Sequence, residues 1–191
     1  MTKRQKKKLF KAVLALVVFL IGALSAHLQN NPAAVPVALQ AGFYQVTQFD
    51  DGDTVIVDMG GVEEKVRFIG VDTPETKDPR KPIQCFGKAA SAFTKNLIGD
   101  QPVKLESDPT NTNRDRYGRL LRYVYLPDGT FVNLEIIKQG YGFAYVSFPV
   151  QKLEEFKAAQ VEAREANRGL WAGCKPVENQ YGGFTSNDEG R

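Results

Sequence analysis

A chain of 191 residues, 42% of them hydrophobic and 25% charged, has room for one globular domain with short appendages. Its net charge of +3 comes from residues 1–26, which hold six basic residues and no acidic one and leave 19 basic against 22 acidic residues elsewhere. The rest of the chain is therefore not a broadly basic nucleic-acid-binding domain, and any contact with nucleic acid must be local, with a cation helping to neutralise the phosphate.

The N-terminus is typical of an export signal. A basic cluster precedes Ala12–Ala26, a run of 15 residues without a charge. Such a run is short for a bilayer span of about 20 residues and suits the core of a signal peptide. We therefore predict that residues 1–28 form a signal peptide or a retained signal anchor, and that residues 29–42 form a linker. The protein would be secreted, or anchored to the outer face of the cytoplasmic membrane.

Five short segments after the linker have the composition and the boundaries of β-strands. Gly60-Gly61 separates the second segment from the third and predicts a tight hairpin, while Pro127-Asp128-Gly129 ends the fifth with a turn. Short strands joined by such turns favour a small barrel. The predicted strands are Tyr44–Phe49, Thr54–Met59, Val62–Val71, Val103–Glu106 and Leu120–Leu126.

Three helical patterns are interspersed with these strands. Apolar residues share one face between Phe86 and Leu97, a short helix is predicted from Val132 to Gln139, and a third lies between Leu153 and Ala166. Residues 175–191 are polar, contain glycine and offer little to bury, so we predict a disordered tail. The globular domain is accordingly placed at residues 43–174.

The two cysteines lie beside predicted helix ends. Cys85 comes just before the first helix and Cys174 just after the last. In an exported domain such a pair favours a disulfide, which would tie the two ends of the helical layer together. The alternative is two unrelated buried thiols.

Three short runs concentrate the residues that carry chemistry. Arginine forks match phosphate oxygens, carboxylates suit a calcium- or magnesium-like ion, and a further acid can act on water. The only histidine, His27, lies just beyond the N-terminal apolar segment, so the body of the chain has no imidazole for a catalytic triad or a histidine-bound metal. These residues point to a metal-assisted reaction on a phosphodiester. The runs are Gly52-Asp53-Thr54, Arg67–Glu75 and Asp115–Arg119.

From Tyr44 to Trp171 the chain resembles the staphylococcal-nuclease-like (thermonuclease) family, because all three runs occur in the family's order and at compatible spacing. Ala89–Lys95, Ala144–Val146 and Gly169–Trp171 match as well. The resemblance implies an α+β fold that is mainly β barrel: a five-stranded OB-fold barrel with three α-helices. It also implies an exported, calcium-dependent endonuclease that hydrolyses phosphodiester bonds of DNA and RNA and leaves 3′-phosphates.

The resemblance further implies roles for individual residues. Glu75 would be the general base that activates water, and Arg67 and Arg119 would flank the scissile phosphate and stabilise its developing charge. Taken singly, an aspartate near Gly or Pro is commonly a turn former, and Arg119 could be a surface strand residue. The implied protein ligands of the Ca²⁺ ion are Asp53, Asp72 and the backbone carbonyl of Thr73.

Three more residues are implied to bind the substrate. Arg116 and Tyr117 match a Lys-Tyr pair that contacts a second phosphate, and Tyr145 matches a tyrosine that lies against the nucleotide. Ser147 stands where the family's archetype has a further tyrosine, so one aromatic wall of the base pocket differs. Without the resemblance, Tyr145 would be read as a half-buried packing residue.

Two other functions remain open from the sequence. The domain could be a noncatalytic OB-type module that binds nucleic acid or protein, or a cell-surface domain whose acids bind calcium only for rigidity. The retention of every implied acid and arginine argues against both. The expected partners are DNA and RNA, preferably single-stranded or frayed, and the membrane if the leader is retained. We expect a monomer.

Overall fold

The computed structural model describes residues 3–5, 41–77 and 82–188. The chain divides into two units, residues 1–38 and 39–191. Of the first unit the structure describes only residues 3–5, which are helical. Apart from residues 3–5, the predicted signal segment lies outside the described residues, as does most of the predicted linker. Within the described ranges, no helix is both long enough and apolar enough to cross a membrane.

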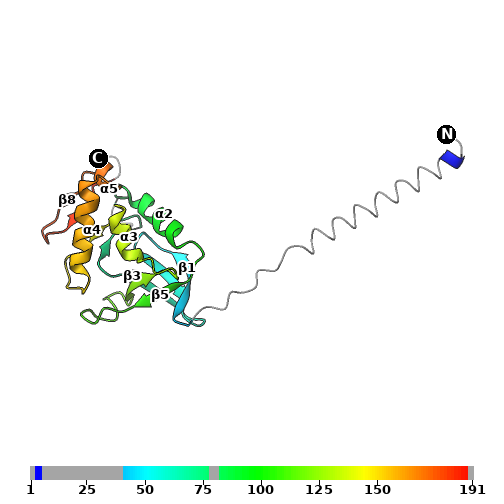
Figure 1. Cartoon of the computed structure of the whole chain (residues 1–191), viewed down its shortest axis with the longest axis horizontal. Helices are drawn as coiled ribbons and strands as arrows, with labels where there is room; N and C mark the ends of the chain where they lie inside the picture. The colour runs from blue at the N-terminus through cyan, green and yellow to red at the C-terminus, as the bar shows by residue number, and fades with distance from the viewer. Residues whose placement is uncertain (1–2, 6–40, 78–81, 189–191) are drawn as a thin grey trace. The chain divides into compact units, whose positions relative to one another are not determined.

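The second unit is built on a closed five-stranded barrel, as predicted (Figure 1). Its strands follow the order β1-β2-β3-β6-β5 around the barrel, and every neighbouring pair is antiparallel except β3 and β6, which are parallel. The five strands are β1 (Phe43–Phe49), β2 (Thr54–Asp58), β3 (Glu63–Phe68), β5 (Val103–Glu106) and β6 (Leu120–Tyr125).

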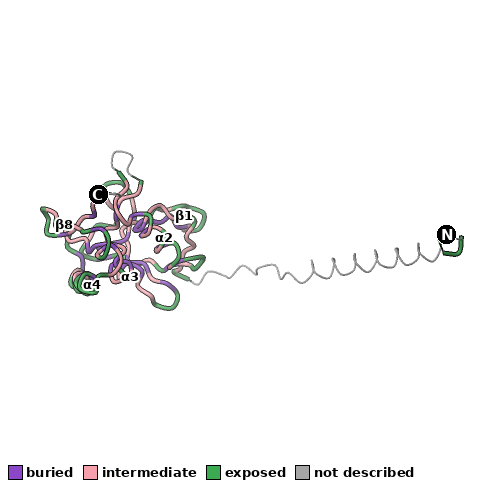
Figure 2. Tube along the Cα trace, turned by 90° about the horizontal axis from the view of Figure 1, so that it is seen from above, coloured by how far each residue is buried: buried purple, intermediate pink, exposed green. Residues whose placement is uncertain are grey.

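Alternating side chains explain why these strands close around one core. Val55 and Val57 on β2 are fully buried, as is Val66 on β3, and Phe68 is 1% exposed. Burying each such side chain contributes about 1.5–3 kcal/mol to folding. Figure 2 shows the buried stretches of the domain in purple, gathered at its centre. The β2–β3 hairpin turns at Gly60 and Gly61, which both have positive φ, so its register pairs Thr54 with Arg67.

The third strand is shorter than predicted because the chain bends at Gly70. Its φ is +74°, and a Cβ placed there would lie 2.2 Å from the Phe156 ring, so only glycine fits the bend. The residues beyond it form a separate short strand, β4 (Val71–Asp72), which pairs with β7 (Phe143–Ala144) instead of continuing β3. The bend thereby places Asp72 outside the barrel wall.

The helices agree with the prediction to within two residues at each end and add one further turn. They are α2 (Gly87–Ile98), α3 (Val132–Lys138), α4 (Leu153–Glu165) and α5 (Leu170–Gly173). Asn133 of α3 is fully buried; its amide donates to the carbonyl of Ile69 and its Oδ1 accepts the N–H of Val124, both at 2.9 Å. This side chain fixes α3 to the barrel.

The predicted disulfide is present between Cys85 and Cys174, and it lies against a second small core. Phe143, Leu170 and Cys174 are buried there, with Trp171 and Phe184 packed against them. The bond joins the segment before α2 to the end of α5, as the sequence suggested.

The structure differs from the predicted disordered tail. Residues 175–188 are ordered and contain a hairpin of β8 (Val177–Glu178) and β9 (Phe184–Thr185). Phe184 packs edge-on against Trp171 at a centroid distance of 5.1 Å. The Asn187 side chain donates to the carbonyl of Cys174 at 3.1 Å. One aromatic contact and a few hydrogen bonds beside the disulfide therefore hold a segment whose composition predicted disorder.

Candidate active site

Asp53 occupies the turn between β1 and β2 and is 4% exposed. Its Oδ2 accepts the Thr73 N–H at 2.8 Å and the Thr73 hydroxyl at 3.1 Å. Thr94 of α2 holds the same turn through a 2.6 Å bond to the Gly52 carbonyl. Asp53 and Thr73, 20 positions apart in the sequence, are thus in direct contact through the N–H and hydroxyl of Thr73.

Asp51 lies just behind this contact. Its Oδ1 accepts the N–H of Asp53 at 3.1 Å. Burial, and after it the negative charge of Asp53, raise the pKa of Asp51 to about 7. A cation bound at this turn would favour the ionised form of Asp51.

Arg67 of β3 supplies the cationic partner of these acids. Its Nη1 donates to the carbonyls of Phe68 and Val71 at 2.8 and 2.7 Å, which clamps the guanidinium to the Gly70 bend. Its Nη2 lies 3.1 Å from Asp53 Oδ2 and 3.3 Å from Asp72 Oδ1. Burial lowers the pKa of Arg67, but the surrounding carboxylates outweigh it and raise that pKa above its usual value. Arg67 therefore stays charged, and two carboxylates converge on one of its nitrogen atoms.

Glu75 lies three residues beyond Asp72 in the loop that follows β4. Its carboxylate Oε1 accepts the N–H groups of Thr76 and Lys77 at 2.8 and 2.7 Å. Its own N–H donates to the Gln84 side-chain carbonyl at 2.8 Å. The carboxylate is thus directed by its own loop, and Glu75 is not among the residues that line the cavity described below.

Arg119 approaches from the loop between β5 and β6. Its Nε lies 2.6 Å from Asp115 Oδ2, and its N–H donates to Asp115 Oδ1 at 3.0 Å. Burial would raise the pKa of Asp115, but the hydrogen bonds from Arg119 lower it. Asp115 therefore stays ionised and orients Arg119. This role of Asp115 was not predicted, although the residue lies only four positions before Arg119.

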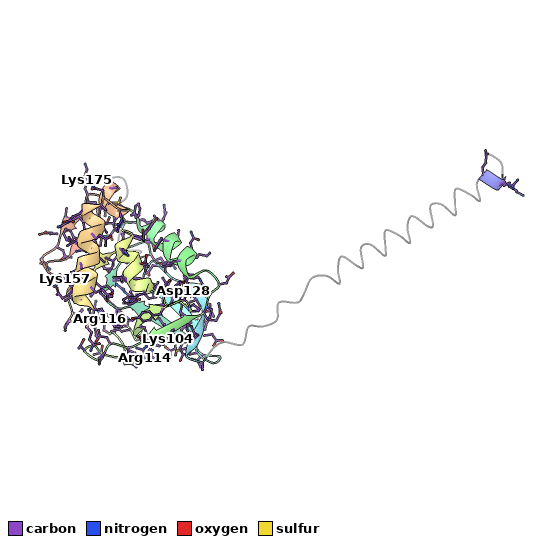
Figure 3. All side chains as sticks on the ribbon, in the orientation of Figure 1. Lys104, Arg114, Arg116, Asp128, Lys157 and Lys175 are labelled. Atoms are coloured by element: carbon purple, nitrogen blue, oxygen red, sulfur yellow. A yellow bond between two sulfur atoms is a disulfide. The ribbon has the colours of Figure 1, made fainter. Side chains whose placement is uncertain are left out.

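Arg116 and Tyr117 extend the same loop outwards; Figure 3 labels Arg116 and, near it in the loop, Arg114. The guanidinium of Arg116 lies 4.7 Å from the centre of the Tyr117 ring and that of Arg119 lies 5.4 Å from it. The ring nevertheless stays 68% exposed. This is an open cationic and aromatic surface of the kind that holds phosphate and base.

A cavity of about 650 Å³ is lined both by residues around the Gly70 bend and by residues of the β5–β6 loop. It brings together six of the nine predicted catalytic, metal and substrate residues and leaves Asp53, Thr73 and Glu75 outside its lining. Phe148 is among the lining residues that were not predicted. It is 58% exposed, and its ring centre lies 5.9 Å from that of Tyr145. It stands next to Ser147, where the aromatic wall was expected to be lacking. The six predicted residues are Arg67, Asp72, Arg116, Tyr117, Arg119 and Tyr145.

The residues that could hold a metal ion offer only oxygen. Among the described residues, no group of three or more His, Cys, Asp and Glu side chains is placed to bind one. The predicted set is smaller, with the carboxylates of Asp53 and Asp72 and one backbone carbonyl. Both carboxylates reach the same nitrogen of Arg67, so in this structure they share the guanidinium as their cationic partner. An all-oxygen set with room for water fits a hard divalent ion.

The chain is similar in sequence to known nucleases. The sequence profile of the staphylococcal nuclease homologues matches residues 65–173. The chain is 44% identical over 129 residues to the thermonuclease of Staphylococcus intermedius, a match that covers 67% of this chain and 75% of the relative. It is 36% identical over 156 residues to endonuclease YncB of Bacillus subtilis (strain 168), covering 81% of this chain and 70% of that protein. On the extent of these matches, the chain belongs to the family of staphylococcal nuclease homologues.

Proposed function

We propose that the protein is an exported, calcium-dependent endonuclease that hydrolyses phosphodiester bonds of DNA and RNA and leaves 3′-phosphates. The observation that carries the proposal is the convergence of Asp53 and Asp72 on Arg67, which lines one cavity together with Asp72 and Arg119. A purely structural calcium site has no use for two arginines at its edge. Family membership supports the same reaction.

Two arginines with different supports would receive the scissile phosphate. Arg67 is fixed by two carbonyls and two acids, and Arg119 by Asp115. Both residues line the cavity, where their guanidinium groups would stabilise charge that grows on the phosphate oxygens during attack. Because both are held before substrate arrives, little reorganisation is needed at the moment of reaction.

Calcium would be held by Asp53, Asp72 and the Thr73 carbonyl, where it would polarise the phosphate and acidify a bound water. Glu75 would accept the proton of the attacking water. Arg116 and Tyr117 would hold a neighbouring phosphate, while Tyr145 and Phe148 would offer their rings to an unpaired base. Contacts to phosphates and stacking on rings would not distinguish one base from another, which fits substrates that include both DNA and RNA.

The test measures cleavage of single-stranded DNA and RNA with calcium, with a chelator, and by the Glu75→Gln variant. We expect the chelator and the substitution each to reduce the rate by about 100-fold or more, and the calcium reaction to yield 3′-phosphate ends. Glu165→Gln, an exposed change at the end of α4, is the matched control and should cleave normally. Tight binding without cleavage in calcium would instead identify a binding module.

Calcium binding and export are tested separately from catalysis. Calorimetric titration with Ca²⁺ should show binding that Asp53→Asn abolishes, whether or not nucleic acid is present. The proposal of export rests on the basic cluster and the uncharged run at the N-terminus. The mass of the protein recovered from medium and membrane fractions would distinguish a cleaved leader from a retained anchor.

A further inference from the structure

Gln84 binds both backbone polar groups of Glu75. The N–H of Glu75 donates to Gln84 Oε1 at 2.8 Å, and the N–H of Gln84 donates to the carbonyl of Glu75 at 2.9 Å. One residue nine positions along the chain thus closes the loop on Glu75 from both sides. Gln84 is half-buried, so these bonds are partly shielded from competing water.

The C-terminal segment 184–188, called the strap below, holds Gln84 and its neighbour in turn. Gln84 Nε2 lies 3.5 Å from the hydroxyl of Thr185, and Gln84 forms an isolated β-bridge with Asp188. The adjacent Cys85 donates its N–H to the Asn187 carbonyl at 2.7 Å, and its carbonyl accepts the hydroxyl of Ser186 at 2.8 Å. The strap therefore bonds to both backbone groups of Cys85.

The disulfide and α2 complete this support. Cys85 is covalently joined to Cys174, and Asn187 of the strap donates to the Cys174 carbonyl. At the start of α2, a Cβ on Gly87 would lie 3.0 Å from the carbonyl oxygen of Glu75, so helix and loop are in close contact. The backbone of Glu75 is thus contacted by Gln84 and lies against the start of α2, and Gln84 is held in turn by residues 184–188.

We propose that Gln84 is a positioning residue for Glu75 and that the strap, secured by the disulfide, sets the position of Gln84. The inference rests on the proposed function, because it gives Gln84 a role only through the base. It adds that the position of Glu75 depends on residues 184–188, more than 100 positions away in the sequence. A displacement of a catalytic group by about 1 Å can lower the rate as much as 100-fold, so loss of these bonds should affect turnover more than substrate binding.

The test compares Gln84→Met, which keeps the length of the side chain and removes its acceptor, with Gln84→Glu, which restores the acceptor. In the full chain, Gln84→Met should lower kcat on single-stranded DNA by about 10-fold and change KM by less than about 2-fold, while Gln84→Glu should recover part of the loss. Gln101→Met, at an exposed glutamine, is the matched control. Ser186→Ala removes one hydroxyl from the strap and should lower kcat by about 2- to 3-fold.

A double-mutant cycle with Glu75→Gln separates positioning from general damage. If Gln84 acts through Glu75, adding Gln84→Met to Glu75→Gln should cause no further loss. Equal fractional losses in both backgrounds, or a rise in KM with kcat unchanged, would overturn the inference while leaving the nuclease proposal intact. Full activity of Glu75→Gln itself would overturn the proposed role of Glu75 and the inference with it. If Gln84→Met does not fold, as judged by its thermal transition, the same cycle with Ser186→Ala decides the question.

Discussion

Asp108 offers the sharpest test of how the cavity walls are held. The residue is 3% exposed and lies at the start of the β5–β6 loop. Its Oδ1 accepts the N–H and the hydroxyl of Thr110 at 2.7 and 2.6 Å, and its Oδ2 accepts the Gln151 N–H at 2.8 Å and the Tyr123 hydroxyl. One carboxylate thus joins the loop of Arg119 to β6 and to the segment before α4.

Asp108→Asn keeps the shape and removes the charge. Whichever way the amide turns, its NH₂ faces a backbone N–H, either that of Thr110 or that of Gln151, and this buried donor loses its acceptor. Leaving one buried donor unpaired costs about 1–3 kcal/mol, and the remaining bonds lose their charge assistance. We therefore expect a loss of about 3 kcal/mol in the free energy of unfolding at pH 7, a large part of the 5–15 kcal/mol typical of a domain.

The dependence on pH provides a second criterion. Burial would raise the pKa of Asp108, but the hydrogen bonds from Thr110, Tyr123 and Gln151 lower it below its usual value. A lowered pKa in the folded state contributes stability above the unfolded value of about 3.9, and that stability is lost as the pH falls through the folded pKa. The difference between wild type and Asp108→Asn should therefore be constant from pH 7 to 5 and shrink below about pH 4.

Urea unfolding of both proteins between pH 7 and 3 measures this difference. Asp128→Asn, in an exposed turn where Asp128 accepts the Thr130 N–H at 2.9 Å, is the control and should change stability far less. A loss below about 1 kcal/mol for Asp108→Asn at pH 7 would contradict the reasoning. So would a difference that stays the same down to pH 3.

Three further outcomes are expected. Phe148→Ala should raise KM for single-stranded DNA by about 5- to 10-fold with kcat nearly unchanged, because one stacking ring is lost. Phe148→Trp should restore binding. An unchanged KM in Phe148→Ala would show that Phe148 does not contact the substrate. Gly140→Ala should lower the free energy of unfolding, measured in urea, by more than about 3 kcal/mol, because its Cβ would lie 2.2 Å from a backbone carbonyl oxygen of the α4–α5 loop. Gly129 has a similar positive φ but open space around it, so Gly129→Ala should cost only about 1–2 kcal/mol. Reduction with dithiothreitol should lower the free energy of unfolding by about 3–4 kcal/mol, and the Cys85→Ser, Cys174→Ser double variant should show that loss without responding to the reductant.

Much of the site follows from local sequence signals. The Gly60-Gly61 turn fixes the β2–β3 register, and that register alone puts Arg67 opposite Thr54 and hence beside Asp53. Alternation of apolar residues then determines which face of each strand enters the core. Strand and helix positions could therefore be predicted from patterns only a few residues long, whereas the pairing of Asp53 with Arg67 was not predicted, and their expected roles came from the family resemblance.

The parts that escaped prediction depend on contacts between distant segments. The ordered tail is stabilised by side chain to backbone bonds such as that from Ser186 to Cys85, 101 positions away, and no periodic pattern records such a bond. Phe148 was missed because an aromatic residue gives no sign in the sequence of whether it faces the core or solvent. Gln84 was missed because a glutamine at a loop end is chemically ordinary until its partners are known.

The disulfide also determines what a protease can do to this protein. Cys85 and Cys174 lie 89 positions apart, and the exposed arginines Arg114 and Arg116 of the β5–β6 loop lie between them. A trypsin-like enzyme that cuts after either residue opens the chain but cannot release a fragment, because the two pieces remain joined through sulfur. Nicked protein would run as one species on a gel until a reductant is added. Where proteases are abundant, the cross-link would thus keep the two pieces of a cleaved chain together.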